Sequence, residues 1–287
     1  MSSLKNLRAQ SGAPIIECKK ALENAGDDLG AAMDWLREHG AAKASSKLQG
    51  RETTEGLVGL KVSADGKTAA LVKVASETDF AGRSAPFVGL VGHVASAILS
   101  STDGVLSEGD ILEAASEGKS IKDALDEAIV AIRENISVPD AKKMQSIYGM
   151  VVGYVHNKVD SSEAGTAAAV VEVAPAAGSS VSDDVLQSVG KKLAMHIVAA
   201  RPLYLSPDNV PIEDLEREKE IILKQMGETG KPADIVEKII MGKMRKFYEG
   251  VCLTEQAHMI EDQNPKVSKV LQEAGIELMR FETLSIS

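Results

Sequence analysis

The chain has 287 residues, 44% of them hydrophobic, and carries a formal net charge of −10. A chain of this length can bury more than one hydrophobic core, so we expect about two to four modules. The acidic balance argues against direct nucleic-acid binding, because a phosphate-binding surface needs clustered lysines and arginines. The sequence contains no run of about 18 apolar residues, so no membrane span is expected.

The first expected module covers residues 1–52 and is helical. A short helix stops at Ser11-Gly12, and a second helix ends at Gly26. A third helix begins after Asp27-Asp28, where a carboxylate can cap free backbone amides, and it ends at Gly40. Apolar residues recur at helical spacing in each segment, which predicts a small three-helix bundle.

The second expected module covers residues 53–146 and begins with a β-hairpin. Alternating apolar residues from Gly56 to Ala75 surround an Asp65-Gly66 turn, which is a strong hairpin signal. Two amphipathic helices follow, Phe87–Leu99 and Ile121–Ile132. A hairpin covered by helices is an α+β unit.

The tetrad Glu77-Thr78-Asp79-Phe80 follows the hairpin directly and precedes the next helix. An aromatic ring beside a carboxylate at an exposed loop tip suits a wedge that enters another protein, because the ring supplies a large apolar area. The alternative is that Phe80 folds back into its own core while Asp79 caps a helix that begins near Ser84.

A second α+β unit is expected from residues 147–206 and 250–287. Its predicted elements are two strands, a helix, a later helix and a closing strand: Tyr148–Val155, Thr166–Val173, Asp183–Ala200, Pro265–Ala274 and Ile276–Phe281. Residues 251–260 are expected to be extended. The unit is interrupted, because a different pattern occupies the residues between its two parts.

That insertion, residues 207–249, predicts two antiparallel helices. Ile212 and Ile222 belong to an apolar stripe on the first helix, and Ile235 and Met244 belong to one on the second. Such a hairpin can offer an apolar surface to another subunit. It can equally be an insertion with no binding role, stabilised only by the packing of its own two helices.

The usual signatures of catalysis are missing from this sequence. It contains no Walker loop, dinucleotide-binding glycine motif, His-Glu-x-x-His motif or nucleophile elbow. Cys18 and Cys252 are too few for a disulfide framework or a zinc site. His156 ends a predicted strand before a polar loop and is the histidine best placed for contact with a partner. We therefore expect no catalytic residue, metal or cofactor, and a protein that acts by binding.

The chain resembles the translation elongation factor Ts family in several segments that occur in the family's order. These segments are Leu7-Arg8 with Ser11–Leu22, Glu77–Phe80, Ala194–Ala200, Gly242–Phe247 and Arg280–Glu282. The resemblance implies a ubiquitin-associated-like N-terminal module, two α+β core subdomains with antiparallel sheets, and an inserted helical hairpin.

The same resemblance implies a guanine nucleotide exchange factor for elongation factor Tu, the GTPase that delivers aminoacyl-tRNA to the ribosome. Such a factor binds both the GDP-bound and the nucleotide-free partner and makes no covalent bond. By matching position, Asp79 and Phe80, with Thr78 beside them, would disturb the magnesium and phosphate region of the partner.

Further contacts are implied at other matching positions. Arg8, Ile15 and Ile16 would belong to the contact made by the N-terminal module, and His156 falls at a contact position of the core. In some members the helical hairpin mediates dimerisation, which would give a homodimer of heterodimers.

The sequence departs from the family pattern at three places. Arg133 stands where a Gly-Glu-Asn-Ile segment usually begins, and Pro14-Ile15-Ile16 replaces a Gly-Met-Met type sequence. A further C-terminal helix is expected to be missing after Glu282. The Pro14-Ile15-Ile16 variant and the Arg51–Leu57 segment are similar to organellar members, so a mitochondrial location is expected, with the transit peptide absent from this numbering. Bacterial cytoplasm is the alternative.

Two functions of other classes remain as alternatives. A ubiquitin-binding adaptor would use only the N-terminal helical module. A hydrolase would need polar groups gathered in a cleft, for which His156, Asp160 and Glu163 are the loosely clustered candidates.

Overall fold

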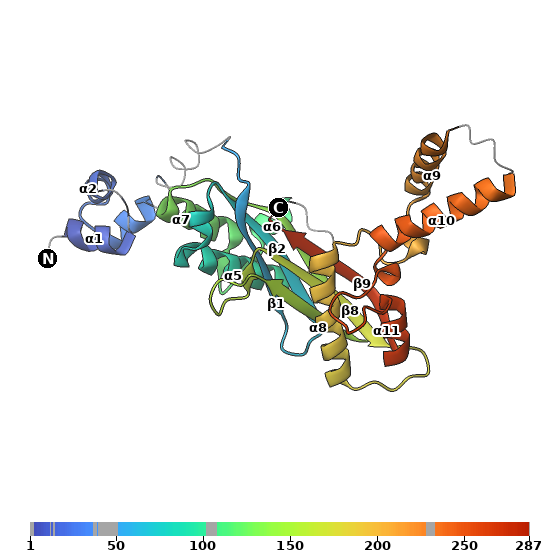
Figure 1. The fold of residues 1–287 in the computed structure, drawn as a ribbon. Helices are drawn as coiled ribbons and strands as arrows, with labels where there is room; N and C mark the ends of the chain where they lie inside the picture. The colour runs from blue at the N-terminus through green and yellow to red at the C-terminus, as the bar shows by residue number, and fades with distance from the viewer. Residues whose placement is uncertain are drawn as a thin grey trace. The chain divides into compact units, whose positions relative to one another are not determined.

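The computed structural model describes residues 3–36 apart from 12 and 14, residue 39, and residues 51–101, 108–227 and 233–286. It is an α+β protein with antiparallel pairing in its larger sheet, as the sequence predicts (Figure 1). The chain forms two compact units, the first from Met1–Gln145, Val155–Ala168 and Leu284–Ser287, and the second from Ser146–Tyr154 and Ala169–Thr283. The finer division into four parts stays a prediction.

The described part of the N-terminal segment consists of helices and the short turns between them. Helix α1 covers Ser3–Ser11, helix α2 covers Ile15–Asn24, and residues 29–36 form a third helix. Asp28 caps this third helix, because its Oδ1 atom accepts a hydrogen bond of 2.7 Å from the backbone N–H of Ala31. The inner faces of the helices form a small core of their own: Leu7, Ala13, Cys18, Ala21, Leu22, Ala32 and Leu36.

A four-stranded sheet forms the centre of the first unit. Strands β1 (Glu55–Val62) and β2 (Thr68–Ser76) make the expected antiparallel hairpin. Its turn is stabilised by Asp65, whose Oδ1 atom accepts from the N–H of Lys67 at 2.9 Å. Strand β5 (Ile136–Gln145) pairs with the other edge of β2, and the short β7 (Ala164–Gly165) pairs with β1.

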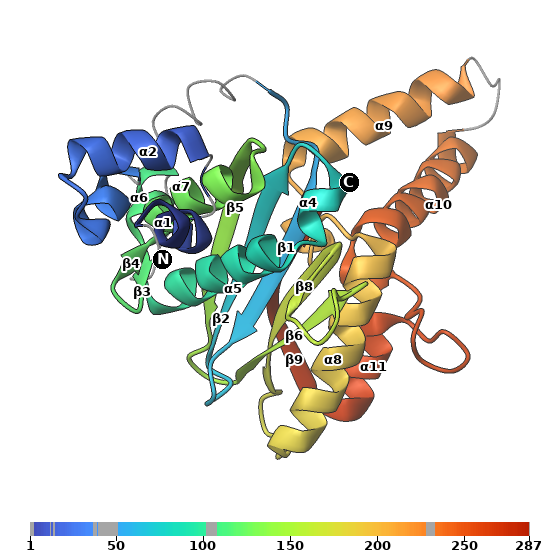
Figure 2. The same ribbon diagram turned by 90° about the vertical axis from the view of Figure 1, so that its left-hand side faces the viewer.

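Helices cover one face of this sheet. Helix α5 (Ala85–Ser100) crosses β1 and β2, and α7 (Ile121–Ile132) packs beside it (Figure 2). Gly59 permits this close approach, because a Cβ atom there would lie only 2.6 Å from Cγ1 of Val91. A short helix and two short strands join α5 to α7: α6 (Glu108–Glu113), β3 (Ala115–Ser116) and β4 (Lys119–Ser120).

The second unit is built around the sheet β6-β8-β9. Strands β6 (Met150–His156) and β8 (Ala167–Pro175) occupy the places that the sequence predicts, and β9 (Ile276–Ser285) closes the sheet. Helices α8 (Asp183–Ala200) and α11 (Val267–Ala274) supply the apolar residues that pack against it. Gly190 of α8 allows close packing, since a Cβ atom there would lie 2.8 Å from Cβ of Val152.

The prediction of an extended segment at residues 251–260 is wrong. Leu253–Glu255 form a 3-10 turn, η2, and only isolated bridges involve this segment, Tyr204 with Cys252 and Ala257 with Lys266. Cys252 and Leu253 are both fully buried, so consecutive side chains point inward. A half-buried strand would place alternate side chains on opposite faces, and this segment does not.

The inserted helical pair is present as helices α9 (Ile212–Met226) and α10 (Ala233–Val251) (Figure 1). Each helix buries one residue of its predicted stripe, Ile222 or Met244, whereas Ile212 and Ile235 are exposed. Two helices can bury only the sides that face each other, so part of each stripe stays open to solvent.

The two ends of the insertion meet. The backbone N–H groups of Leu203 and Tyr204 both donate to the carbonyl of Val251, at 2.9 and 3.0 Å. A short 3-10 turn, η1 (Pro207–Asn209), leads from this junction toward α9. Across the described part of the chain, no helix has the length and apolar character needed to cross a membrane.

Candidate functional site

The ring of Phe80 is 80% exposed, although it belongs to one of the most apolar residue types. Phe80 lies in α4, a single helical turn covering Asp79–Gly82. The sequence predicts no helix here, so this turn corrects the expected loop. The alternative in which Phe80 folds into its own core is wrong.

Asp79 does not cap the following helix. Ser84 takes that role, because its Oγ atom accepts from the N–H of Phe87 at 3.4 Å. The carboxylate of Asp79 is 55% exposed and lies 3.8 Å from the guanidinium of Arg83, which is itself 80% exposed. An ion pair this open to water holds its partners weakly, so the carboxylate is available to another protein. We call Thr78, Asp79 and Phe80 the tip.

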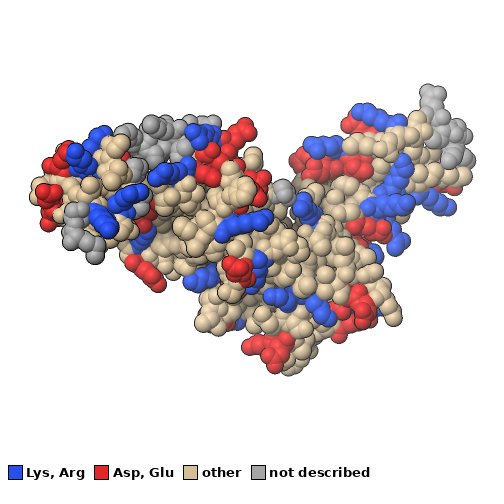
Figure 3. All heavy atoms as spheres, turned by 60° about the vertical axis from the view of Figure 1, so that its left-hand side comes forward, with Lys and Arg blue, Asp and Glu red and all other residues tan. Residues whose placement is uncertain are grey.

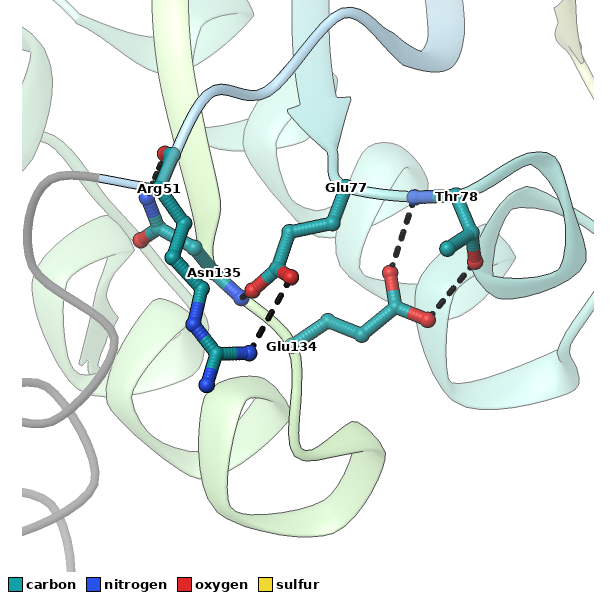
Figure 4. A network of polar contacts seen from close by, with 5 residues as sticks. All are labelled: Arg51, Glu77, Thr78, Glu134 and Asn135. Carbon is teal, nitrogen blue, oxygen red and sulfur yellow. Dashed lines mark hydrogen bonds and ion pairs between the residues drawn. The ribbon is translucent and has the colours of Figure 1, made fainter.

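The tip is held by a carboxylate from another segment. Oε2 of Glu134 accepts from the backbone N–H of Thr78 at 3.0 Å, and Oε1 accepts from its hydroxyl at 2.7 Å (Figure 4). Ser76, at the end of β2, is fully buried and donates its hydroxyl to the carbonyl of Thr78 at 3.0 Å. Both the amide and the carbonyl of Thr78 are therefore fixed.

A second set of bonds lies beside the first. Glu77 accepts from the backbone N–H of Asn135 at 2.6 Å and from the guanidinium of Arg51 at 3.2 Å (Figure 4). The side-chain amide of Asn135 donates to the backbone carbonyl of Arg51 at 2.8 Å. The hydrogen bond from the Asn135 N–H, followed by the hydrogen bond and then the charge of Arg51, lowers the pKa of the Glu77 carboxyl, so Glu77 stays ionised over a wider pH range.

Strand register explains why these residues meet. Ser76 of β2 pairs with Ile136 of β5 in the antiparallel sheet. One step beyond this pair, Glu77 faces Asn135, and two steps beyond it, Thr78 faces Glu134. The sequence alone does not reveal this, because Glu134 is 56 positions from Thr78. The only sequence signal was that Glu134 and Asn135 match the Glu-Asn of the Gly-Glu-Asn-Ile segment that is usual in the family.

The other predicted contact residues lie on exposed surfaces. Arg8 is exposed in the last turn of α1, and Ile15 and Ile16 are 51% and 66% exposed at the start of α2. The next residue but one, Cys18, is fully buried in the module's core. His156 is exposed at the end of β6, and its carbonyl accepts from the N–H of Thr166 at 3.0 Å.

Within the described residues, no group of three or more His, Cys, Asp or Glu side chains is arranged to hold a metal. Glu163, a residue of the hydrolase alternative, is paired with Lys158 at 2.7 Å. On the face drawn in Figure 3, acidic and basic side chains are interspersed among the described residues, so that face has no continuous basic surface.

Comparison with known proteins gives a consistent result. Residues 77–287 match the family model described as "Elongation factor TS". A protein named elongation factor Ts from Paramagnetospirillum magneticum is 40% identical over 279 residues, which is 96% of this chain and 86% of that protein. Proteins of the same name from Allorhizobium ampelinum and Gluconobacter oxydans are 39% and 37% identical, over 94% and 99% of this chain and 85% and 90% of theirs.

These three relatives are bacterial, so they give no support to the expected mitochondrial location. The family model begins at the first residue of the tetrad and covers the rest of the chain. The relatives extend the similarity through the N-terminal helices as well, since they cover nearly the whole sequence. The chain belongs to the elongation factor Ts family.

Proposed function

We propose that this member of the translation elongation factor Ts family binds GDP-bound elongation factor Tu and promotes GDP release. In this proposal Asp79 and Phe80 enter the partner beside its magnesium and phosphate site. Loss of Mg²⁺ removes the charge that neutralises the β-phosphate, so GDP leaves faster and GTP then binds. The protein acts as an exchange factor and makes no bond itself.

The observation that carries the proposal is the 80% exposure of the Phe80 ring. Burying a phenylalanine ring in a partner removes roughly 150 to 250 Å² from water. At about 25 cal/mol per Å², this area corresponds to a gross driving force of about 4 to 6 kcal/mol. The exposed ring of Phe80, held on a fixed turn, can therefore gain this free energy only when a partner protein buries it.

Linkage converts this driving force into nucleotide release. A factor that binds nucleotide-free partner better than GDP-bound partner must weaken GDP binding by the same ratio. If about 4 kcal/mol of the gross term survives as coupling, GDP binds about a thousandfold more weakly. No bond-making residue is needed for an effect of this size.

The remaining predicted contacts supply affinity in this proposal. Arg8, Ile15 and Ile16 present a charged and apolar surface on the N-terminal helices for the nucleotide-binding domain of the partner. His156 adds a contact from the end of β6. A homodimer of heterodimers through α9 and α10 is an additional proposal, supported by the exposed apolar residues on these helices, such as Met241 at 65%.

For the compartment, we propose bacterial cytoplasm, in agreement with the bacterial relatives. Elongation factor Tu of such a bacterium is therefore the natural partner for the test.

The test measures release of a fluorescent GDP analogue from elongation factor Tu over a range of concentrations of this protein. We expect the native chain to accelerate release, and Phe80→Ala and Asp79→Ala each to lower the maximal rate at least about tenfold, a change equivalent to only about 1.4 kcal/mol. Tyr148→Ala is the matched control, because Tyr148 is an aromatic residue of nearly equal exposure, 78%, outside the tip. Unchanged release with the native chain would end the proposal.

A further inference from the structure

We propose that Glu134 is a positioning residue for nucleotide exchange: it holds the tip in the orientation that presents Phe80 to the partner. This inference rests on the proposed exchange function. Glu134 is not one of the exposed residues of the tip, and its two carboxylate oxygens both accept hydrogen bonds from Thr78. It acts through Thr78 on Phe80.

The geometry is that of a helix cap supplied from outside the helix. Thr78 is the N-cap residue of α4, yet its side chain makes no capping bond, and its hydroxyl donates to Glu134. In a capping box, a glutamate of the helix's own first turn accepts from the N-cap N–H. Here Glu134 accepts that N–H from 56 positions away. The cap thus ties α4 to the loop between α7 and β5.

The tie is reciprocal. Glu134 accepts from the backbone of Thr78, and Glu77 accepts from the backbone of Asn135. Two consecutive residues of one segment are therefore bonded to two consecutive residues of the other, each through a carboxylate. Arg51 adds a third segment, because it bonds both Glu77 and Asn135.

A tip held in this way is arranged before it meets its partner. A single helical turn has too few internal hydrogen bonds to persist alone. Packing anchors only the far end of α4, where Ala81 and Gly82 are buried, whereas Asp79 and Phe80 are exposed and are not fixed by packing. Without Glu134, the tip would have to be ordered during binding, and that cost would reduce the coupling available for GDP release. The loss should appear in the maximal exchange rate.

The main variant is Glu134→Gln, which keeps the shape of the side chain. An amide has one acceptor oxygen in place of two and carries no charge, so the N–H and the hydroxyl of Thr78 can no longer each donate to a separate carboxylate oxygen, and both bonds lose their charge assistance. We expect the maximal rate of GDP release to fall about tenfold. The concentration that gives half-maximal rate should change less than about twofold, because the other contact surfaces are intact.

Glu127→Gln is the matched control. Glu127 lies on α7, in the same unit, and is paired with Lys119 at a surface position. The same carboxylate-to-amide change there should leave the exchange rate at the native value. Circular dichroism melts of both variants establish that each is folded.

A double variant tests the path of action. If Glu134 works through Phe80, Glu134→Gln should cause little further loss in a Phe80→Ala background. An equal loss in both backgrounds would overturn the inference, as would a native rate for Glu134→Gln alone. Thr78→Val provides a second route if Glu134→Gln does not fold. It removes only the hydroxyl bond, and a maximal rate about threefold below native is expected, whereas a native rate would refute the inference.

The outcomes separate the two proposals. If the native chain does not accelerate release, the exchange function fails. If the native chain accelerates release and Phe80→Ala lowers the maximal rate, while Glu134→Gln matches Glu127→Gln, only the positioning role of Glu134 fails.

Discussion

The side chain of His258 is fully buried, and within the described part of the chain its Nε2 atom has no hydrogen-bond partner. Its Nδ1 atom accepts from the N–H of Ile260 at 3.2 Å. The ring centroid lies 5.0 Å from that of His196, which is held by Gln256 at 3.0 Å. Burial, and then the neighbouring His196, lowers the pKa of His258 to about 4.

This burial predicts a loss of stability in acid. The unfolded chain binds a proton at His258 below pH of about 6.5, whereas the folded protein resists protonation until about pH 4. The contribution of neutral His258 to the free energy of unfolding is therefore fully present above pH of about 6.5. It falls as the pH drops toward 4, by at most about 3 kcal/mol. Urea unfolding at several pH values measures this, and His258→Leu should flatten the dependence.

His93→Leu is the comparison for this experiment. His93 lies in the other unit, where a ring nitrogen of its side chain is 3.2 Å from the carbonyl of Lys119. Its replacement should leave the acid sensitivity of the second unit intact. The ion pair of Lys192 and Glu261 also influences His258, with opposite effects from its two charges. An unchanged slope in His258→Leu would show that another group carries the acid response.

Among the elements, helix α7, like α8 with Arg201, ends at a non-glycine residue in a left-handed conformation. Its C-cap is Arg133, which has a left-handed conformation with φ 65° and ψ 31°. The N–H of Arg133 still donates to the carbonyl of Ile129 at 2.8 Å, as a helix end requires. A residue with a Cβ atom is strained in this region by about 1 kcal/mol, whereas glycine is not.

Arg133→Gly is therefore expected to stabilise the first unit, by about 0.5 kcal/mol after the greater freedom of glycine in the unfolded chain is included. The unfolding midpoint should rise by about 1 to 2 °C in a thermal melt. Arg133→Ala loses the same side-chain contacts but keeps the strain, so it should show no rise. Equal midpoints for the two variants would contradict the explanation.

At the scale of the whole molecule, the proposed function divides the work between two surfaces. In this proposal the exposed isoleucines of α2 provide affinity for the partner, and the tip disturbs the magnesium and phosphate site of the partner. Ile16→Ser should raise the half-maximal concentration for exchange roughly tenfold, because burying an isoleucine contributes about 1.5 to 3 kcal/mol. The maximal rate should stay near the native value, which is the reverse of the effect expected for Phe80→Ala.

Leu203→Ser is the matched control for this prediction. Leu203 is 68% exposed and Ile16 is 66% exposed, so the two changes remove similar apolar surface from the free protein. Titration of exchange rate against factor concentration measures both variants. A fall in the maximal rate of Ile16→Ser, with an unchanged half-maximal concentration, would place Ile16 with the tip.

Much of the fold follows from local patterns. Helix α8 matches its predicted bounds, Asp183–Ala200, and the hairpin turn at Asp65-Gly66 is where the sequence places it. These features depend on residues within a few positions of one another, which a sequence displays directly. The prediction for residues 251–260 was wrong, because the path of this segment depends on backbone hydrogen bonds from Leu253 to Tyr204 and from Thr254 to Leu205, which lie far away in the sequence.

The sequence by itself determined the longer helices, the hairpin, the tetrad and the family, since each depends on neighbouring residues. Only the tertiary structure decided that Phe80 is exposed, that Asp79 begins a helical turn and that Glu134 holds Thr78. The physical reason is strand pairing. The register of Ser76 with Ile136 brings two distant segments together, and the hydrogen bonds that orient the tip form across that junction.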